Sequence, residues 1–207
     1  MTTARHNPGA RDLFAALPET DEDAQRRLHA RLVAEAGRAG VLDVAYRTVD
    51  TPLGALLLAA TGKGLVRVAY AREDHDAVLE QLANSISPRV LHAPARLDLA
   101  ADELEEYFAG RRTGFDLPLD LRLSSGFRRT VLSHLSDIAY GSTASYAAVA
   151  AAAGNPKAVR AVGTACATNP LPVVLPCHRV IRSDGVLGQY VGGADAKHAL
   201  LTLETAA

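Results

Sequence analysis

The hydrophobic pattern of this chain of 207 residues changes near residue 121. Before that point, short apolar runs alternate with polar residues or stop at glycine-containing turns, which is typical of strands. After it, apolar residues recur at helical spacing, as they do from Phe127 to Ile138. Strands and helices present apolar faces with different periods. The change therefore predicts an α+β protein, of mixed α and β content, with a domain boundary between residues 121 and 122.

Residues 1–40 are expected to form an N-terminal helical extension. The pattern predicts a helix from about Asp21 to Arg38, with Thr20 as its N-cap, acidic residues in its first turn and Gly40 closing it. A short apolar stripe runs along this helix at Leu28, Leu32 and Val33. Such a stripe is enough to dock on another surface but not to fold alone.

Residues 41–121 are expected to form a small domain of antiparallel strands and helices. Strands are predicted at 44–48, 55–60, 65–69 and 115–119, and helices at 74–85 and 99–109. Turns are predicted at Thr51–Gly54 and Thr61–Gly64. This segment has no evident nucleophile, phosphate-binding loop or metal cluster, so its expected role is structural support.

Residues 122–207 are predicted to be mainly helical. A helix over 127–138 is followed by one from Tyr146 to Ala153, which ends at Gly154. Asn155 is the expected cap of a third helix over 157–167, with Pro156 at its first position. Two short helices joined by a tight turn suggest a helix-turn-helix, although most helical hairpins do not touch DNA.

Composition and charge narrow the class of protein. No apolar run approaches the ~20 residues of a membrane helix, and no export signal is evident, so a cytoplasmic protein with reduced thiols is expected. The two cysteines show no metal-ligand spacing. Residues 1–120 hold 14 Lys+Arg against 19 Asp+Glu, whereas residues 121–207 hold 8 against 4. The positive excess is compatible with contact to phosphates, but a solvated surface explains it equally simply.

The segment Leu175–Ser183 contains the strongest chemical signal. Cys177 follows a proline and precedes His178, and a nearby imidazole can promote formation of the nucleophilic thiolate. The dipeptide alone is weak evidence, because most buried cysteines are inert. Its surroundings decide the interpretation.

Those surroundings resemble the O6-alkylguanine-DNA alkyltransferases. The resemblance rests on L-P-C-H-R-V-I-R-S-D-G-V-L-G-Q-Y-V-G-G at 175–193, G-N-P-K-A-V-R-A-V-G at 154–163, Asn169-Pro170, Lys197 and L-L-T-L-E at 200–204. It covers 122–207, and T-P-L-G-A-L-L-L-A extends it into 41–121. It implies a ribonuclease-H-like support domain at 41–121 and a DNA-binding alkyltransferase domain with a helix-turn-helix at 122–207.

The resemblance also implies residue roles. The catalytic set would be Cys177, His178, Glu204 and Asn169. Cys177 would attack the alkyl carbon, His178 would act as base through a water, and Glu204 would orient the imidazole. Asn169 would hold the active-site turn in shape. The sulfur is then expected at the floor of an open cleft shaped for an everted purine.

DNA-binding residues implied by the resemblance are Arg160, Tyr146, Ser145, Lys157 and Ala158. Arg160 would fill the space left by the everted nucleotide, and Tyr146 would crowd its phosphate. An exposed helical arginine and a half-buried tyrosine are the simpler alternatives. The substrate pocket would be lined by Tyr190, Val180, Val191, Gly188 and Cys166.

The function implied is DNA repair by direct reversal. One alkyl group would move irreversibly from O6-alkylguanine in double-stranded DNA to Cys177, with O4-alkylthymine as a candidate second substrate. No cofactor or metal is expected, and the protein is expected to be a monomer without membrane contact. Two alternatives remain: a lesion-binding protein that does not repair, and a cysteine hydrolase using Cys177 and His178.

Overall fold

A four-stranded sheet with strand order β3-β2-β1-β4 forms the centre of the first half of the chain. The computed structural model describes residues 21–205. The strands are β1 (Val44–Thr51), β2 (Gly54–Thr61), β3 (Gly64–Tyr70) and β4 (Val90–His92). Neighbours β1, β2 and β3 are antiparallel, as expected, but β4 pairs in parallel with β1 and was not predicted.

The two predicted turns join these strands. Thr51 pairs with Gly54 across the first hairpin and Thr61 with Gly64 across the second. Gly64 has φ 137°, and a Cβ there would collide with the carbonyl of Pro118. Only glycine fits this close approach without strain.

The predicted strand at 115–119 is wrong. Leu119 forms a single parallel bridge with Leu65, and the rest of the segment is irregular. The amide of Leu65 donates to the Pro118 carbonyl at 2.8 Å and its carbonyl accepts from Asp120 at 2.8 Å. Since Pro118 has no amide hydrogen, it cannot complete a strand ladder.

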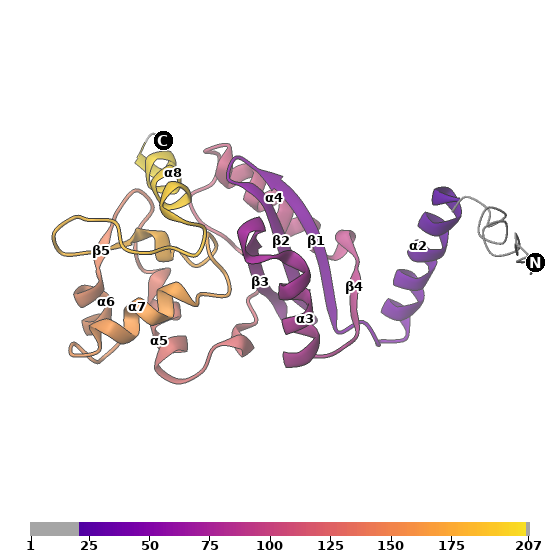
Figure 1. Ribbon diagram of the computed structural model, residues 1–207, viewed down its shortest axis with the longest axis horizontal. Coiled ribbons are helices and arrows are strands. Elements are labelled where there is room, and N and C mark those ends of the chain that lie inside the picture. The colour runs from indigo at the N-terminus through magenta and orange to yellow at the C-terminus, as the bar shows by residue number, and fades with distance from the viewer. Residues whose placement is uncertain (1–20, 206–207) are drawn as a thin grey trace, which may run out of the picture. The chain divides into compact units, whose positions relative to one another are not determined.

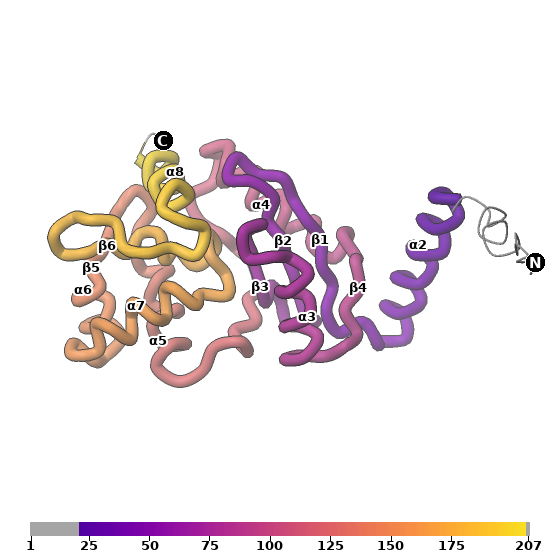
Figure 2. Tube along the Cα trace, in the orientation of Figure 1, coloured from indigo at the N-terminus to yellow at the C-terminus, as the bar shows by residue number. Residues whose placement is uncertain are grey.

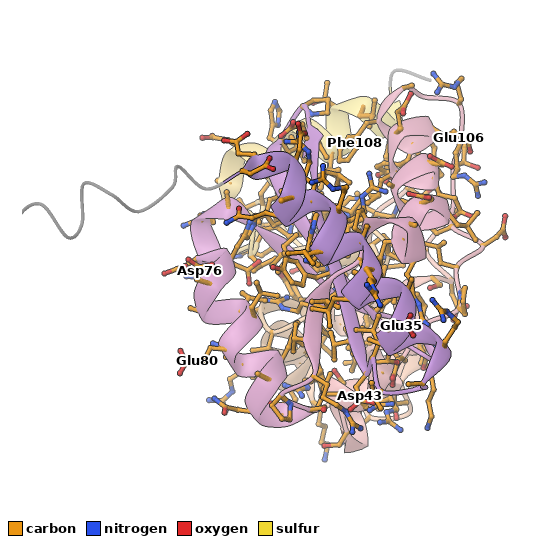
Figure 3. The ribbon with its side chains drawn as sticks, turned by 90° about the vertical axis from the view of Figure 1, so that its right-hand side faces the viewer. Glu35, Asp43, Asp76, Glu80, Glu106 and Phe108 are labelled. Atoms are coloured by element: carbon orange, nitrogen blue, oxygen red, sulfur yellow. The ribbon has the colours of Figure 1, made fainter. Side chains whose placement is uncertain are left out.

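Helices cover both faces of the sheet. Helix α3 (His75–Ser85) and helix α4 (Asp98–Phe108) lie close to their predicted positions. Figure 1 shows α3 in front of the strands and α4 behind them, and in the rotated view of Figure 3 the strands lie between the two helices. Val78 and Leu82 of α3 pack on Val44, Leu57 and other strand residues. Asp76 and Glu80 of α3 project outward in Figure 3, on the acidic half of the chain.

The second half consists mainly of helices. They are α5 (Gly126–Leu135), α6 (Tyr146–Ala152), α7 (Val159–Ala167) and α8 (Ala194–Thr205). Two short strands, β5 (Ala144–Ser145) and β6 (Val180–Ile181), pair in parallel and lie side by side in Figure 2. The amide of Val68 in β3 donates to the carbonyl of Pro170 at 2.8 Å, which ties the sheet to the helical part.

Two helix boundaries differ from the predictions. Helix α5 ends at Leu135, because the amides of Asp137 and Ile138 bond to carbonyls three residues back and the Ile138 carbonyl accepts from Arg179. Helix α7 begins only at Val159, and Asn155 does not cap it. Residues 155–158 instead form a turn, in which the Ala158 amide donates to the Asn155 carbonyl at 2.9 Å.

Within the described range, residues 21–41 and 42–205 belong to separate units. In the first unit, helix α2 (Glu22–Arg38) is capped by Asp21, whose side chain accepts from the amides of Asp23 and Ala24. Thr20, the expected cap, lies outside the described residues. Gly40 follows the helix with φ 66°, as expected for a residue that closes it. Leu28 and Leu32 are 67% and 54% exposed. Among the helices of residues 21–205, none combines the length and apolarity that crossing a bilayer requires.

Candidate active site

The turn that precedes Cys177 is held by the side chain of Asn169. Its Nδ2 donates to the Leu175 carbonyl at 2.8 Å, and its Oδ1 accepts from the Leu171 amide at 3.0 Å. Nδ2 also lies 3.1 Å from Sγ of Cys177, so that an amide hydrogen points at the sulfur. Val173, within the turn, has φ 73°, a conformation that is strained for a β-branched residue. The surrounding hydrogen bonds therefore hold the turn in a shape that its sequence does not favour.

Cys177 begins a short 3₁₀ turn, Cys177–Arg179, and is buried. Burial raises the pKa of its thiol to about 11, while the hydrogen bond from Asn169 and the charge of Lys197 act in the opposite direction. The Lys197 side chain is fully buried, and its Nζ donates to the Val180 carbonyl at 2.6 Å. At neutral pH the resting sulfur is thus a thiol, and a base is needed to make it nucleophilic.

His178 and Glu204 form a buried pair. Nε2 of His178 donates to Oε1 of Glu204 at 2.8 Å, and neither side chain is exposed. Burial lowers the pKa of His178, although Glu204 opposes this, so the imidazole is neutral at pH 7. Its Nδ1 is buried and has no hydrogen-bond partner within residues 21–205. The Nε2–H bond leaves Nδ1 as the unprotonated nitrogen, which can accept a proton.

The carboxylate of Glu204 collects several donors. Arg179 binds both of its oxygens, with Nε 2.9 Å from Oε2 and Nη2 2.9 Å from Oε1. The Tyr107 hydroxyl donates to Oε1 at 2.6 Å, and the Gly141 amide donates to Oε2 at 3.2 Å. Burial acts to raise the pKa of Glu204, but the hydrogen bonds from His178, Arg179 and Tyr107 outweigh it and lower the pKa to about 2. The carboxylate is therefore fully ionised.

The expected pocket residues surround this centre. Val180 and Cys166 are fully or nearly fully buried, Tyr190 is 8% exposed, and Val191 and Gly188 are half-buried. The Tyr190 hydroxyl lies 3.0 Å from that of Tyr70 in β3. Cys166 and Cys177 are both free thiols, and burial raises the pKa of Cys166 to about 12.

Within residues 21–205, Cys177 is not exposed at the floor of a cleft, as the resemblance had implied, because the residue is only 2% exposed. The ring of Tyr190 lies edge-on to that of His178, with ring centroids 6.2 Å apart. The Tyr146 hydroxyl packs so closely on Gly188 that a Cβ there would overlap it. A neighbouring cleft of about 370 Å³ includes Asn169 and Val191 in its lining but not Cys177. The segment that carries Gly188 therefore packs against the Tyr146 side chain, and the sulfur itself is buried.

Family models and curated relatives match most of this chain. Residues 44–121 match the family described as 6-O-methylguanine DNA methyltransferase, ribonuclease-like domain, and residues 126–206 match its DNA binding domain. A methylated-DNA–protein-cysteine methyltransferase of Mycobacterium tuberculosis is 42% identical over 159 residues, which are 77% of this chain and 91% of that protein. The constitutive enzyme of Bacillus subtilis is 40% identical over 77% of this chain and 94% of its own length.

The chain belongs to the 6-O-methylguanine-DNA methyltransferase family.

Solved structures of this methyltransferase family support the assignment. The O6-methylguanine methyltransferase of Mycobacterium tuberculosis superposes with a TM-score of 0.70 at 39% identity, covering 79% of this chain and 93% of that one. The same protein in complex with DNA gives a TM-score of 0.68 at 39% identity, covering 78% and 93%. The predicted α+β fold, with a ribonuclease-like domain and a helical DNA-binding domain, is confirmed.

The expected DNA-binding residues of this methyltransferase lie around α6 and α7. Ser145 caps α6 by accepting from the Ala148 amide at 3.1 Å, and Tyr146 is the first residue of that helix. Lys157 and Ala158 lie in the turn before α7, where Lys157 is exposed. Arg160 is exposed in the first turn of α7 and forms no ion pair with any residue in the described range. Helices α5, α6 and α7 pack on one another, so this surface has a rigid base.

Sequence reasoning missed three residues of the methyltransferase site. Arg179 and Lys197 stand inside the quoted motifs, so their basic side chains on an otherwise apolar background were an available signal. Tyr107 lies in the segment interpreted as support and had no local signal. Within residues 21–205, no group of three or more His, Cys, Asp or Glu side chains is arranged to hold a metal ion.

Proposed function

We propose that Sγ of Cys177 accepts the alkyl group in a direct-reversal repair of DNA. Membership of the family makes the chain a methylated-DNA–protein-cysteine methyltransferase, which transfers an alkyl group from DNA to one of its own cysteines in a single turnover. The proposal names the residues that carry out the alkyl transfer, the lesion from which the alkyl group comes and the order of the steps. The lesion is O6-alkylguanine in double-stranded DNA, with O4-alkylthymine as a second candidate.

The buried His178–Glu204 pair carries the proposal. The 2.8 Å bond between them leaves Nδ1 of His178 as the free base, in a residue adjacent to the thiol. Nδ1 takes the thiol proton through a bridging water as Sγ attacks the alkyl carbon. The S–C bond forms, the C–O6 bond breaks, and the electron pair returns to guanine. Guanine then takes up one proton from solvent, and His178 releases to solvent the proton that it took from the thiol.

Asn169 and Lys197 stabilise the sulfur as charge develops on it. Asn169 donates to Sγ, and the ammonium of Lys197 acts on it through space. Both contributions favour the thiolate over the thiol. Because the product is a thioether, which water does not cleave readily, each molecule reacts once.

An alkylated base inside the duplex cannot reach a buried sulfur, so the nucleotide must rotate out of the stack. Arg160 is the proposed occupant of the vacated space, and Tyr146 the residue that crowds the phosphate. Ser145, Lys157 and Ala158 line the same interface. Tyr190, Val180, Val191, Gly188 and Cys166 form the pocket for the everted base. Because Cys177 is buried, entry of the base requires residues around the sulfur to move, and the contact between Tyr146 and Gly188 is the proposed point of opening.

The remaining assignments are coarser. Residues 41–121 are proposed to support the site and 122–207 to bind DNA and react, while the role of residues 1–40 stays open. A monomeric, cytoplasmic protein without cofactor or metal remains the prediction from the sequence.

The test is the intact mass of the protein before and after incubation with duplex DNA containing O6-methylguanine. One added methyl group, located on the Cys177 peptide, is expected. Cys177→Ala should bind the lesion without gaining mass, and the matched variant Cys166→Ala should still be methylated once. Repeated turnover of an ester or amide would favour a hydrolase. Lesion binding by the unaltered protein with no mass change would favour a binding protein, and either result defeats the proposal.

A further inference from the structure

A tyrosine of the ribonuclease-like domain reaches the acid–base pair of the other domain. Tyr107, in α4, is fully buried, and its hydroxyl donates to Oε1 of Glu204 at 2.6 Å. The same hydroxyl lies 3.5 Å from Nε2 of His178, which donates to the same oxygen. Oε1 of Glu204 thus accepts hydrogen bonds from Tyr107 of one domain and from His178 of the other. The Tyr107 hydroxyl also lies next to Nε2 of His178, whose protonation defines the tautomer.

Packing of the ring does not require this hydroxyl. The Tyr107 ring contacts Phe108, Phe115 and Tyr140, with ring centroids 5.5, 5.2 and 6.1 Å away. Phenylalanine would keep these contacts. In the protein interior, a hydroxyl must find a partner to offset its desolvation. Here the partner of the Tyr107 hydroxyl is the charged carboxylate of Glu204. A backbone carbonyl would have satisfied the hydroxyl equally well if the residue had only a packing role.

We propose that Tyr107 is a positioning residue for alkyl transfer: its hydroxyl holds the Glu204 carboxylate so that His178 keeps its proton on Nε2 and presents Nδ1 to the thiol. The inference rests on the proposed roles of Cys177, His178 and Glu204. It gives the ribonuclease-like domain a residue that acts on the catalytic pair, a role that the sequence of this domain does not indicate.

The chemistry follows from competition for one oxygen. A hydrogen bond from Tyr107 withdraws negative charge from Oε1 of Glu204. The carboxylate then still orients the imidazole of His178 but stabilises its protonated form less. Without the hydroxyl, the carboxylate interacts more strongly with the imidazolium form, and His178 protonates at higher pH. Protonated His178 cannot accept the thiol proton. The titratable or charged groups facing the pair are Tyr107, Tyr140, Arg179, Tyr190 and Lys197.

The experiment compares the full-length protein with Tyr107→Phe in single-turnover methyl transfer from O6-methylguanine duplex DNA across pH 5 to 9. The maximal rate constant is expected to fall about tenfold, as for loss of a hydrogen bond to a charged group. The acid limb of the profile should move upward by about one pH unit. The DNA concentration at half-maximal rate and the final yield of one methyl per protein should not change.

Two further variants separate positioning from packing. Tyr46→Phe is the matched control, since Tyr46 lies in β1 and no hydrogen bond joins its hydroxyl to a side chain of the site within residues 21–205. It should keep the unaltered profile. In a Glu204→Gln background, Tyr107→Phe should have no further effect on the rate, because Tyr107 acts through Glu204. If Tyr107→Phe lowers the rate in the Glu204→Gln background as much as it does in the unaltered protein, the proposal is overturned. It is also overturned if Tyr107→Phe lowers the yield of methylated protein while the rate constant and the pH profile stay unchanged.

If Tyr107→Phe does not fold, the unaltered protein decides the matter by NMR. His178 should be protonated at Nε2, and that proton should show a nuclear Overhauser effect to the Tyr107 hydroxyl proton. Protonation at Nδ1, or no such effect, overturns the proposal. Failure of the unaltered protein to transfer methyl would instead defeat the proposed function, so the two failures are distinguishable.

Discussion

Nδ2 of Asn169 lies 3.1 Å from Sγ of Cys177 while donating to the Leu175 carbonyl in the turn that carries the sulfur. One amide group therefore both shapes the nucleophile's turn and places a donor against its sulfur. Since neither partner is exposed to water, both contacts are sensitive to loss of the side chain.

Replacing Asn169 by alanine should slow alkyl transfer and destabilise the fold. The Leu171 amide would lose its acceptor, which costs about 1–3 kcal/mol in the free energy of unfolding, and the Leu175 carbonyl would keep only the Cys177 amide as a donor. The pKa of Cys177 should rise further, because a donor to the thiolate is removed. Urea unfolding and the pH dependence of thiol alkylation measure the two effects. Asn84→Ala, on the exposed side of α3, is the control, and equal behaviour of the two variants would contradict the assigned role.

Arg160→Ala should affect duplex DNA much more than a free base. The side chain is exposed and has no ion-pair partner among residues 21–205, so its loss should leave the unfolding free energy within about 0.5 kcal/mol. Transfer from lesion duplex should fall about tenfold or more, whereas reaction with free O6-alkylguanine should change little. Arg111→Ala removes the same charge elsewhere on an exposed surface and should change neither. Equal losses on duplex and free base would show that Arg160 does not enter the duplex.

Stability should decline as the pH falls below about 6.5. The pKa of His178 is lowered from 6.5, so the unfolded chain takes up this proton first. The pKa of Glu204 is about 2 instead of 4.5, so its contribution is complete above pH 4.5 and is lost as the pH falls toward 2. That contribution is of the order of 3 kcal/mol. Urea titrations at pH 7, 5, 4 and 3 measure the decline. Glu204→Gln should flatten the curve below pH 4.5, and an unchanged slope would argue against the ionised buried pair.

Gly188→Ala should disturb the contact with Tyr146. A Cβ at this position overlaps the Tyr146 hydroxyl, the movable end of a side chain, so the loss in unfolding free energy should be about 1 kcal/mol. Displacement of the ring should slow transfer from duplex DNA about tenfold. Adding Tyr146→Phe to Gly188→Ala should restore stability, because the colliding oxygen is removed. Gly62→Ala, where a Cβ meets only open space, is the control. No recovery in the double variant would show that this contact is not the source of the loss.

Local patterns predicted most of the fold. The hairpins of β1, β2 and β3 and the positions of α3, α4 and α6 followed from alternation, helical spacing and glycine punctuation. Strand β4 was missed because three residues are too few to show a period. The strand expected at 115–119 does not form, although its apolar residues do alternate. The Pro118 carbonyl accepts a hydrogen bond from the sheet, but proline has no amide hydrogen to donate in return.

The residues of the candidate site were likewise predicted only in part. Cys177 and His178 are adjacent in a motif, and Glu204 and Asn169 came from the family resemblance; the structure brings all four together. Tyr107 could not be found this way, since it meets Glu204 across 97 positions of sequence and stands in an ordinary amphipathic helix. The burial of Cys177 also depends on tertiary packing alone.

Glycines 192 and 193 press against side chains of the ribonuclease-like domain. A Cβ on Gly192 would enter the Tyr70 ring, and one on Gly193 would meet Arg72. Variation in the segment that leads from the pocket to α8 is thus limited by residues more than a hundred positions earlier in the chain. Anyone grafting this segment from a relative to admit bulkier lesions will have to keep glycine at position 193, where φ is 93°, and either retain Gly192 or exchange Tyr70 together with it.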